Sequence, residues 1–256
     1  MDDFTEVLKV AIDAGKAIMK IYNEGDFGVE MKSDNSPLTL ADKAAHKIIV
    51  EGLKSTGIPV LSEEGDEEIP YGERKNWKEL WIVDPLDGTK EFIKRNGEFT
   101  VNIALVREGI PVFGVVYAPA LKKLYYGATG SGAFLVKSDN IDGEAVPLGR
   151  NSLPETFTMV GSRSHGSPET ESYVDEMKKI HGAVEFIASG SSLKFCLVAE
   201  RNAHAYPRFA PTMEWDTAAG HAVLLAAGGK VVVWPDKTEL RYNREQLLNP
   251  WFLALI

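Results

Sequence analysis

The sequence predicts an α/β protein with two lobes: helices followed by an antiparallel sheet in residues 1–150, then a mixed or parallel sheet with covering helices in residues 151–256. Short apolar runs between residues 100 and 136 are separated by turn signals, and connections this short join antiparallel neighbours. From residue 157 onward, strand-like and helix-like runs alternate, which is typical of a sheet covered by helices. The polar segment 138–154, with Gly143 and two prolines, is the expected lobe boundary.

In the first lobe, apolar residues recur at helical spacing over residues 4–22. A second helix is expected from Thr39 to residue 53, because Thr39 and Asp42 have the spacing of a capping box. Residues 66–76 are expected to form a charged loop. The apolar runs predict strands at 58–61, 81–83, 100–106, 112–119, 124–127 and 132–136.

In the second lobe, the same patterns predict helices at 168–180, 191–200 and 216–227. The intervening strands are expected at 157–161, 184–188, 203–206, 230–234 and 252–256.

Composition narrows the class of protein. The chain has 256 residues and a net charge of −9, which argues against binding a nucleic-acid polymer through a general basic surface. No segment approaches the ~20 apolar residues of a membrane helix, and the acidic start does not resemble a signal peptide. The single cysteine, Cys196, fits a reducing compartment and a place in the core. We expect a cytoplasmic protein, with peripheral membrane association left open.

The stretch W-I-V-D-P-L-D-G-T-K-E-F at residues 81–92 carries the strongest chemical signal. Pro85 lacks an amide hydrogen and is expected to end the preceding strand. Asp84 and Asp87 then lie close together on a tight bend formed with Gly88. Neighbouring carboxylates repel unless a cation intervenes, and hard oxygen ligands suit Mg²⁺. A metal site and an ordinary surface turn both remain open from these residues alone.

The spacing of the two acids argues against one class of phosphatase. Aspartyl-phosphate enzymes of the haloacid-dehalogenase type use D-x-D-G-T, which puts both acids on one face of a strand. Here two residues, Pro85 and Leu86, separate the acids. The pair is therefore better placed to share metals than to act as nucleophile and acid.

Polar residues elsewhere have both a chemical and an ordinary interpretation. Asp42 could simply stabilise a helix start, and Glu63 follows a short strand as a loop acid would. Asp216 could be a helix N-cap. Ser191 and Lys194 open a helix whose free amides could bind phosphate, although a serine cap followed by a solvated lysine looks the same.

Two further residues have the same ambiguity. Arg208, among aromatic residues and a proline, suits a bidentate phosphate contact or stacking on a base, but an ordinary surface arginine is equally compatible. His165 could contact a ligand or cap the following turn.

Taken together, Glu63-Glu64, then D-P-L-D-G-T, then W-D-T-A-A-G resemble the signature of the inositol-monophosphatase-like phosphatases, which are Mg²⁺-dependent and lithium-sensitive. The resemblance covers nearly the whole chain and implies a layered α-β-α-β-α fold. The continuation Lys90-Glu91-Phe92, with G-S-S-L-K-F-C-L-V-A-E and Y-P-R-F, resembles the bisphosphate nucleotidase branch of the family. That branch removes the 3′-phosphate of adenosine 3′,5′-bisphosphate, and the resemblance implies a role in sulfur metabolism.

The resemblance also implies roles for individual residues. Two or three Mg²⁺ ions would be held by Glu63, Asp84, Asp87, Asp216 and the backbone carbonyl of Leu86. The pair that activates water would be Asp42 and Thr89. Substrate contacts would fall on the metal-site residues Glu63, Leu86, Asp87 and Asp216, on Gly88 and Thr89, and on Ser191, Lys194, Arg208 and His165. Glu214 and the loop 66–76 have no role in this interpretation.

These residues predict metal-assisted hydrolysis by water, with the Thr89 hydroxyl, hydrogen-bonded to Asp42, orienting the water and relaying its proton. The implied partner is a small nucleotide bisphosphate, either adenosine 3′,5′-bisphosphate or its 5′-phosphosulfate. An inositol or sugar phosphate monoesterase on the same scaffold is the alternative enzyme, and a nucleotide-binding regulator without turnover is the alternative from another class. The oligomeric state, monomer or homodimer, stays open.

Overall fold

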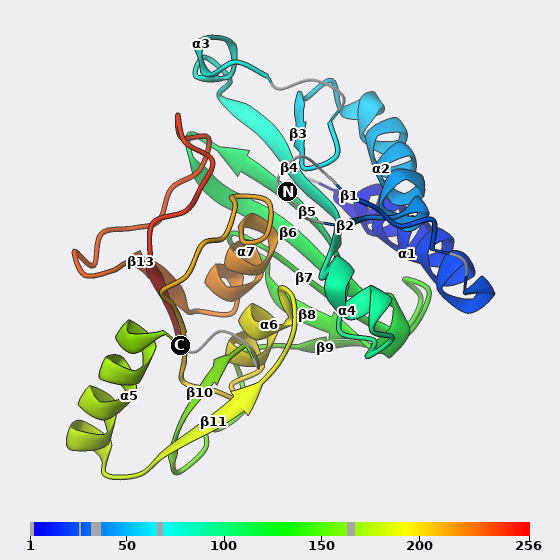
Figure 1. Cartoon of the computed structure of the whole chain (residues 1–256). Helices are drawn as coiled ribbons and strands as arrows, with labels where there is room; N and C mark the ends of the chain where they lie inside the picture. Colours follow the sequence, from blue (N-terminus) through cyan, green and yellow to red (C-terminus); the bar gives the residue numbers. More distant parts are fainter. Residues whose placement is uncertain (1–2, 26, 32–36, 66–68, 163–166) are drawn as a thin grey trace.

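Helices and sheets alternate in five layers (Figure 1). The structure is a computed structural model that describes residues 3–25, 27–31, 37–65, 69–162 and 167–256. A seven-stranded sheet runs in sequence order, with β3 parallel to β4 and every later neighbour antiparallel. Its strands are β3 (Val60–Ser62), β4 (Glu79–Asp87), β5 (Thr100–Arg107), β6 (Ile110–Ala118), β7 (Lys123–Ala128), β8 (Gly132–Val136) and β9 (Ala145–Pro147).

The second sheet has five strands in the order β11-β10-β12-β14-β13. Its strands are β10 (Phe157–Gly161), β11 (Val184–Ala188), β12 (Ala205–Arg208), β13 (Lys230–Val233) and β14 (Phe252–Leu255). β10 pairs in parallel with β11 and β12, whereas β14 is antiparallel to both of its neighbours. The sheet is therefore mixed, as the alternation of strands and helices predicted.

Alternating side chains of each strand build the layers. In β4, Trp81 and Val83 pack with helices α1 (Thr5–Glu24) and α2 (Leu40–Leu53). Leu80 and Ile82 face the opposite side, where α6 (Leu193–Ala199) and α7 (Ala218–Ala226) lie between the two sheets. Helix α5 (Pro168–His181) covers the outer face of the five-stranded sheet. This order confirms the layered α/β fold. The boundary near residue 150 stays a prediction, because one apolar cluster joins both sheets through α6 and α7.

The structure corrects several sequence-based boundaries. β4 does not stop before Pro85 but continues to Asp87 through an irregularity in its pairing with β5. The predicted helices 191–200 and 216–227 are shorter, because their first residues form loops that face a pocket. The expected charged loop contains the short helix α3 (Tyr71–Arg74). Short elements also escaped prediction: β1 (Glu30–Met31), β2 (Pro37–Leu38), the 3₁₀ turns η1 (Lys54–Thr56) and η2 (Pro119–Leu121), α4 (Thr89–Ile93) and β9.

Within the described ranges, no helix combines the length and apolar character needed to cross a membrane.

Candidate functional site

The irregularity in β4 brings two acids to the same place. Asp84 pairs with Asn102 and Asp87 with Thr100, so one extra residue of β4 is accommodated between them. Residues three apart in a regular strand point to opposite faces, and a bulge of this kind realigns them. Pro85 has no amide hydrogen to donate, which suits an unpaired position, and the Leu86 amide bonds to Asp84 Oδ1 at 3.0 Å.

A third acid comes from a segment far along the chain. Asp216 lies in the loop before α7, where its Oδ2 accepts a hydrogen bond from the Met213 amide at 2.8 Å. Thr217, not Asp216, is the N-cap of α7, so the interpretation of Asp216 as a simple helix cap is wrong. Asp84, Asp87 and Asp216 each offer a carboxylate oxygen, and these oxygens lie within 4.8 Å of one another.

The electrostatics of this cluster favour a bound cation. Burial raises the pKa of Asp84 well above its usual range, and the carboxylates of Glu63, Asp87 and Asp216 add to the effect. Burial, followed by the nearby Asp87, raises the pKa of Asp216 to about 8, although the Met213 amide opposes the rise. Burial also raises the pKa of Asp87, against the opposing charge of Lys194. Such acids cannot all ionise at neutral pH without a compensating charge.

The donor set fits a hard divalent cation. It consists of carboxylate oxygens of the three aspartates. Glu63 lies on the adjoining pocket wall, directly after β3, and the Glu63 amide donates to the Val83 carbonyl at 3.1 Å. Oxygen-only ligands suit Mg²⁺, Ca²⁺ or Mn²⁺, whereas sites for softer metals use sulfur or imidazole. The roles of Glu63 and of the Leu86 carbonyl as ligands stay predictions.

Asp42 serves the helix and the site with different oxygens. Its Oδ2 accepts from the Thr39 amide at 2.7 Å and from the Thr39 hydroxyl at 2.5 Å, and Thr39 Oγ1 accepts from the Ala41 amide, which completes the predicted capping box. Its Oδ1 accepts from the Thr89 hydroxyl at 3.4 Å, a long contact. Burial raises the pKa of Asp42. The two interpretations of Asp42 are therefore compatible in one side chain.

The loop before α6 closes around the cluster. The Ser192 amide donates to Asp87 Oδ2 at 2.6 Å, and the Ser192 hydroxyl donates to the Asp216 carbonyl at 2.6 Å. The Ser191 hydroxyl lies 2.9 Å from the Asp87 carbonyl and 2.7 Å from the Glu98 carbonyl, so its proton is already engaged. A side chain on Gly88, whose φ is +90°, would collide with this Ser191 hydroxyl. The serines thus connect the loop before α6 to the segments that carry Asp87 and Asp216 instead of forming a simple helix cap.

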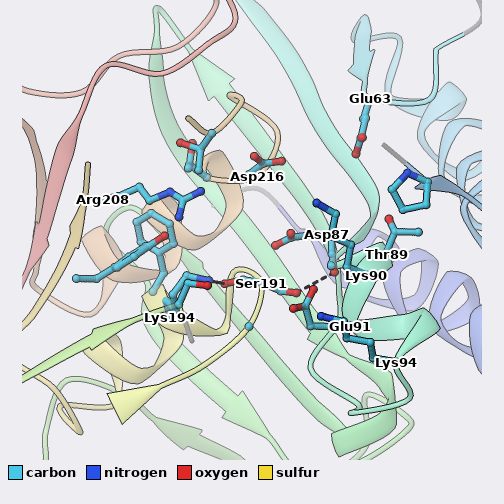
Figure 2. A pocket seen from close by; sticks show the side chains of 18 residues that line it. Glu63, Asp87, Thr89, Lys90, Glu91, Lys94, Ser191, Lys194, Arg208 and Asp216 are labelled. Carbon is cyan, nitrogen blue, oxygen red and sulfur yellow. Dashed lines mark hydrogen bonds between the residues drawn. The ribbon is translucent and has the colours of Figure 1, made fainter. Parts of the chain in front are cut away.

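A cavity of about 340 Å³ opens beside the acids, and Figure 2 shows its lining. Lys194 is buried on one wall, where Nζ donates to the Ser191 carbonyl at 2.7 Å and lies 5.5 Å from the centre of the Tyr206 ring. Burial lowers the pKa of Lys194 to about 8, although the charge of Asp87 opposes this. Arg208 lies on the same wall and donates to the Pro211 carbonyl at 2.8 Å. His165 lies outside the described residues.

The structure adds residues that sequence reasoning missed. Asn102 donates to Ser192 Oγ at 2.9 Å and to Asp87 Oδ2 at 3.4 Å, and it is the kind of buried polar residue within an apolar strand that calls for a partner. Helix α4 brings Lys90, Glu91 and Lys94 to the pocket. Lys90 and Glu91 entered the sequence analysis only as part of the family resemblance, and their place in the pocket follows from tertiary structure.

Glu214, which had no expected role, anchors the segment that carries Asp216. Its carboxylate accepts from the Asn243 amide at 2.7 Å and from the Arg244 amide and Nε at 3.1 Å each. The segment 243–245, to which Glu214 is bound, is held in turn by Arg74, which donates to the carbonyls of Arg244 at 2.6 Å and Glu245 at 2.8 Å. Through Arg74, the part of the charged loop from residue 69 to 76 thus helps to hold residues 243–245, which in turn bind Glu214 next to the site.

Comparison with known proteins agrees with this geometry. A family model described as "Inositol monophosphatase family" matches residues 1–251. The 3′(2′),5′-bisphosphate nucleotidase CysQ of Salmonella typhimurium is 48% identical over 98% of both chains. The crystal structure of CysQ from Bacteroides thetaiotaomicron is 51% identical, covers 96% of this chain and 94% of its own, and has a TM-score of 0.88. The IMPase TM1415 of Thermotoga maritima is 25% identical, covers 100% and 92%, and has a TM-score of 0.75. The chain therefore belongs to the inositol monophosphatase family.

Proposed function

We propose that this protein is a phosphoric monoester hydrolase that removes the 3′-phosphate of adenosine 3′,5′-bisphosphate to give AMP and phosphate. The observation that carries the phosphatase chemistry is the group of Asp84, Asp87 and Asp216 beside a pocket lined by four cationic side chains, Lys90, Lys94, Lys194 and Arg208. The choice of substrate is supported by the CysQ relatives, whose name includes 3′(2′),5′-bisphosphate nucleotidase. A role in sulfur metabolism and activity on the 5′-phosphosulfate analogue belong to the same proposal.

The three aspartates, Glu63 and the Leu86 carbonyl would hold two or three Mg²⁺ ions. When bound, Mg²⁺ supplies a Lewis acid that lowers the pKa of water and balances the charge of the phosphate.

The remaining chemistry belongs to side chains around the cluster. The Thr89 hydroxyl, hydrogen-bonded to Asp42, orients the attacking water, and Asp42 takes up the proton. Burial makes Asp42 a stronger base than an exposed aspartate, which suits a proton acceptor. The absence of a side chain at Gly88 lets Ser191 pack against the turn that carries Asp87. Lys194 and Arg208 offset the charge of the nucleotide. Displacement is direct, so phosphate passes to water without a phospho-enzyme.

The test is phosphate release from adenosine 3′,5′-bisphosphate, its 5′-phosphosulfate, inositol monophosphate and a sugar phosphate, with Mg²⁺ and with or without Li⁺. We expect the bisphosphate nucleotides to be the fastest substrates and Li⁺ to inhibit. Asp84→Asn should abolish release while the variant remains folded, and the exposed Asp139→Asn should leave it intact. Faster release from inositol monophosphate would favour the alternative monoesterase. Thermal stabilisation by nucleotide and Mg²⁺ without release would indicate a binding protein.

A further inference from the structure

A buried polar network holds the turn that carries Asp216. Asn249 reaches this turn from the C-terminal segment, and its Nδ2 donates to the Met213 carbonyl at 2.7 Å and to Thr217 Oγ1 at 3.0 Å. The hydroxyl of Thr217 donates within the turn, to the Glu214 carbonyl at 3.2 Å. Met213 is the residue whose amide donates to the Asp216 carboxylate, and Thr217 is the next residue after Asp216. The network therefore holds the turn on both sides of Asp216.

The orientation of the Asn249 amide is fixed by a donor on its far side. Arg244 Nη2 donates to Asn249 Oδ1 at 2.8 Å, and a guanidinium group can only donate. The Asn249 oxygen must therefore face Arg244, which leaves both of its N–H bonds for the turn. Because Asn249 is only 6% exposed, flipping this amide would leave buried polar groups without partners.

Tyr242 directs the hydroxyl of Thr217 in the same way. The one proton of Thr217 Oγ1 goes to a carbonyl of the turn, so the Tyr242 hydroxyl, 3.3 Å away, must be the donor between the two side chains. Tyr242 then has no proton for His221, whose Nδ1 lies 3.0 Å from the same hydroxyl. His221 therefore carries its proton on Nδ1 and donates it to Tyr242. Burial lowers the pKa of His221 to about 3, so the ring is neutral near pH 7.

These donors form one directed chain that ends on the backbone of the turn. It runs from His221 through Tyr242 to Thr217, and all three side chains are buried, so water has little access to their hydrogen bonds. The acid that the turn carries is under strain from its surroundings, because the charge of Asp87 repels the charge of Asp216 when no cation lies between them. A turn with a single arrangement keeps Asp216 in place against this repulsion.

Resting on the role of Asp216 as a cation ligand in the function proposed above, we propose that Tyr242 and Asn249 are positioning residues for Asp216. They hold its turn so that its carboxylate stays with those of Asp84 and Asp87. Both residues are buried and act through the turn, so their loss should weaken cation binding and leave substrate binding unchanged. Partners that orient a metal ligand typically contribute about 10- to 100-fold to metal affinity.

The binding test uses Mn²⁺ alone, whose free concentration is measured by electron paramagnetic resonance, with the full chain. In Tyr242→Phe, which removes only the hydroxyl, the Kd for Mn²⁺ should rise by about tenfold, and in Asn249→Ala by at least as much. Tyr125→Phe is the matched control: it removes another buried tyrosine hydroxyl, which donates to Glu200 in the same apolar cluster, and should change the Kd less than twofold. Circular dichroism checks that each variant is folded, and if Asn249→Ala is not, Tyr242→Phe decides.

A second pair of variants separates the hydroxyl from packing. Thr217→Val should weaken Mn²⁺ binding by about tenfold, because it removes the oxygen that accepts from Tyr242 and Asn249, whereas Thr217→Ser should keep the affinity within twofold. Wild-type affinity in Tyr242→Phe, or an equal loss in Tyr125→Phe, would overturn the proposal, since the network would then support only the fold.

Phosphate release gives an independent measure. The Mg²⁺ concentration for half-maximal release from adenosine 3′,5′-bisphosphate should rise by about tenfold in Tyr242→Phe, while KM for the nucleotide at saturating Mg²⁺ changes less than twofold. A change in KM alone would contradict the positioning of Asp216. If the wild type binds Mn²⁺ but releases no phosphate, the proposed function fails and the Mn²⁺ comparison still decides the role of Tyr242. If the wild type binds no Mn²⁺, the role of Asp216 as a cation ligand fails, and the positioning proposal fails with it.

Discussion

Replacing Asp216 by asparagine should make the metal-free protein more stable. The pKa of Asp216 is raised from 3.8 to about 8 in the folded chain. Its raised pKa means that the folded state binds the proton more tightly than the unfolded state does. Between pH 3.8 and about 8, stability from this group is therefore present at low pH and falls as pH rises.

The size of the effect follows from this pKa. At pH 7, keeping the carboxyl protonated costs up to about 4 kcal/mol relative to the unfolded chain. Asp216 lines the pocket and is only partly buried, so solvent screening reduces the expected gain on removing it to about 2 kcal/mol. For a chain of this size, that gain corresponds to a rise in Tm of about 4–8 °C. Asparagine retains an oxygen that can accept from the Met213 amide, so this contact can be kept.

The assay is thermal unfolding at pH 7, in EDTA and then in Mg²⁺. In EDTA, Asp216→Asn should melt above the wild type. In Mg²⁺ the wild type should gain more, because a ligand that binds the folded state more tightly raises its stability more. Asp139→Asn, which removes an exposed partner of Lys122, is the control and should not change the response to Mg²⁺. If Asp216→Asn melts below the wild type in EDTA, burial and the nearby Asp87 do not destabilise the charged Asp216, and the reasoning fails.

Three other predictions follow from the site. Thr89→Ala should lower kcat by ~10²-fold with little change in KM, whereas Thr89→Ser should retain most activity; a rise in KM alone would reduce Thr89 to a substrate contact. Glu214→Ala should lower the free energy of unfolding in urea by about 3 kcal/mol, since it removes a buried carboxylate that accepts three hydrogen bonds from the partly buried donors of residues 243 and 244. Glu245→Ala, which leaves its carbonyl in place, should be neutral. Burial lowers the pKa of Lys194 to about 8, so its positive charge is lost above that pH. In calorimetry, the product 5′-AMP should therefore bind more weakly as pH rises through 8. Lys194→Arg should remove this pH dependence of binding, because arginine keeps its charge.

Local sequence patterns correctly predicted those features, such as helix caps, whose interactions lie within a few residues. The capping box at Thr39 and Asp42 formed because its hydrogen bonds lie within one helical turn. The prediction that Pro85 ends the strand was wrong, although proline rarely continues a strand. Only the pairing of Asp84 and Asp87 with β5 shows that a bulge accommodates Pro85. The register of a strand depends on its partner, which the local pattern does not contain.

The site shows the same limit. The motif at residues 84–89 indicated two of the acids, and the structure brings Asp216 to them from the loop before α7. Glu214 and Asn102 were missed because their partners lie far away in the sequence. Lys90 counted in the sequence only toward the family resemblance, and tertiary structure is what places Lys90 and Lys94 in the pocket.

The position of α7 between the sheets governs how this protein can come apart. Seven consecutive residues of α7, Ala218 to Leu224, are buried, and a side chain at Gly220 would run into the Phe195 ring of α6. Neither sheet can detach without opening this layer, so the amides of α7 should exchange with deuterium only when the whole chain unfolds. A fragment ending at residue 150 would leave the face of the seven-stranded sheet that α7 covers exposed to water, and we expect it to aggregate.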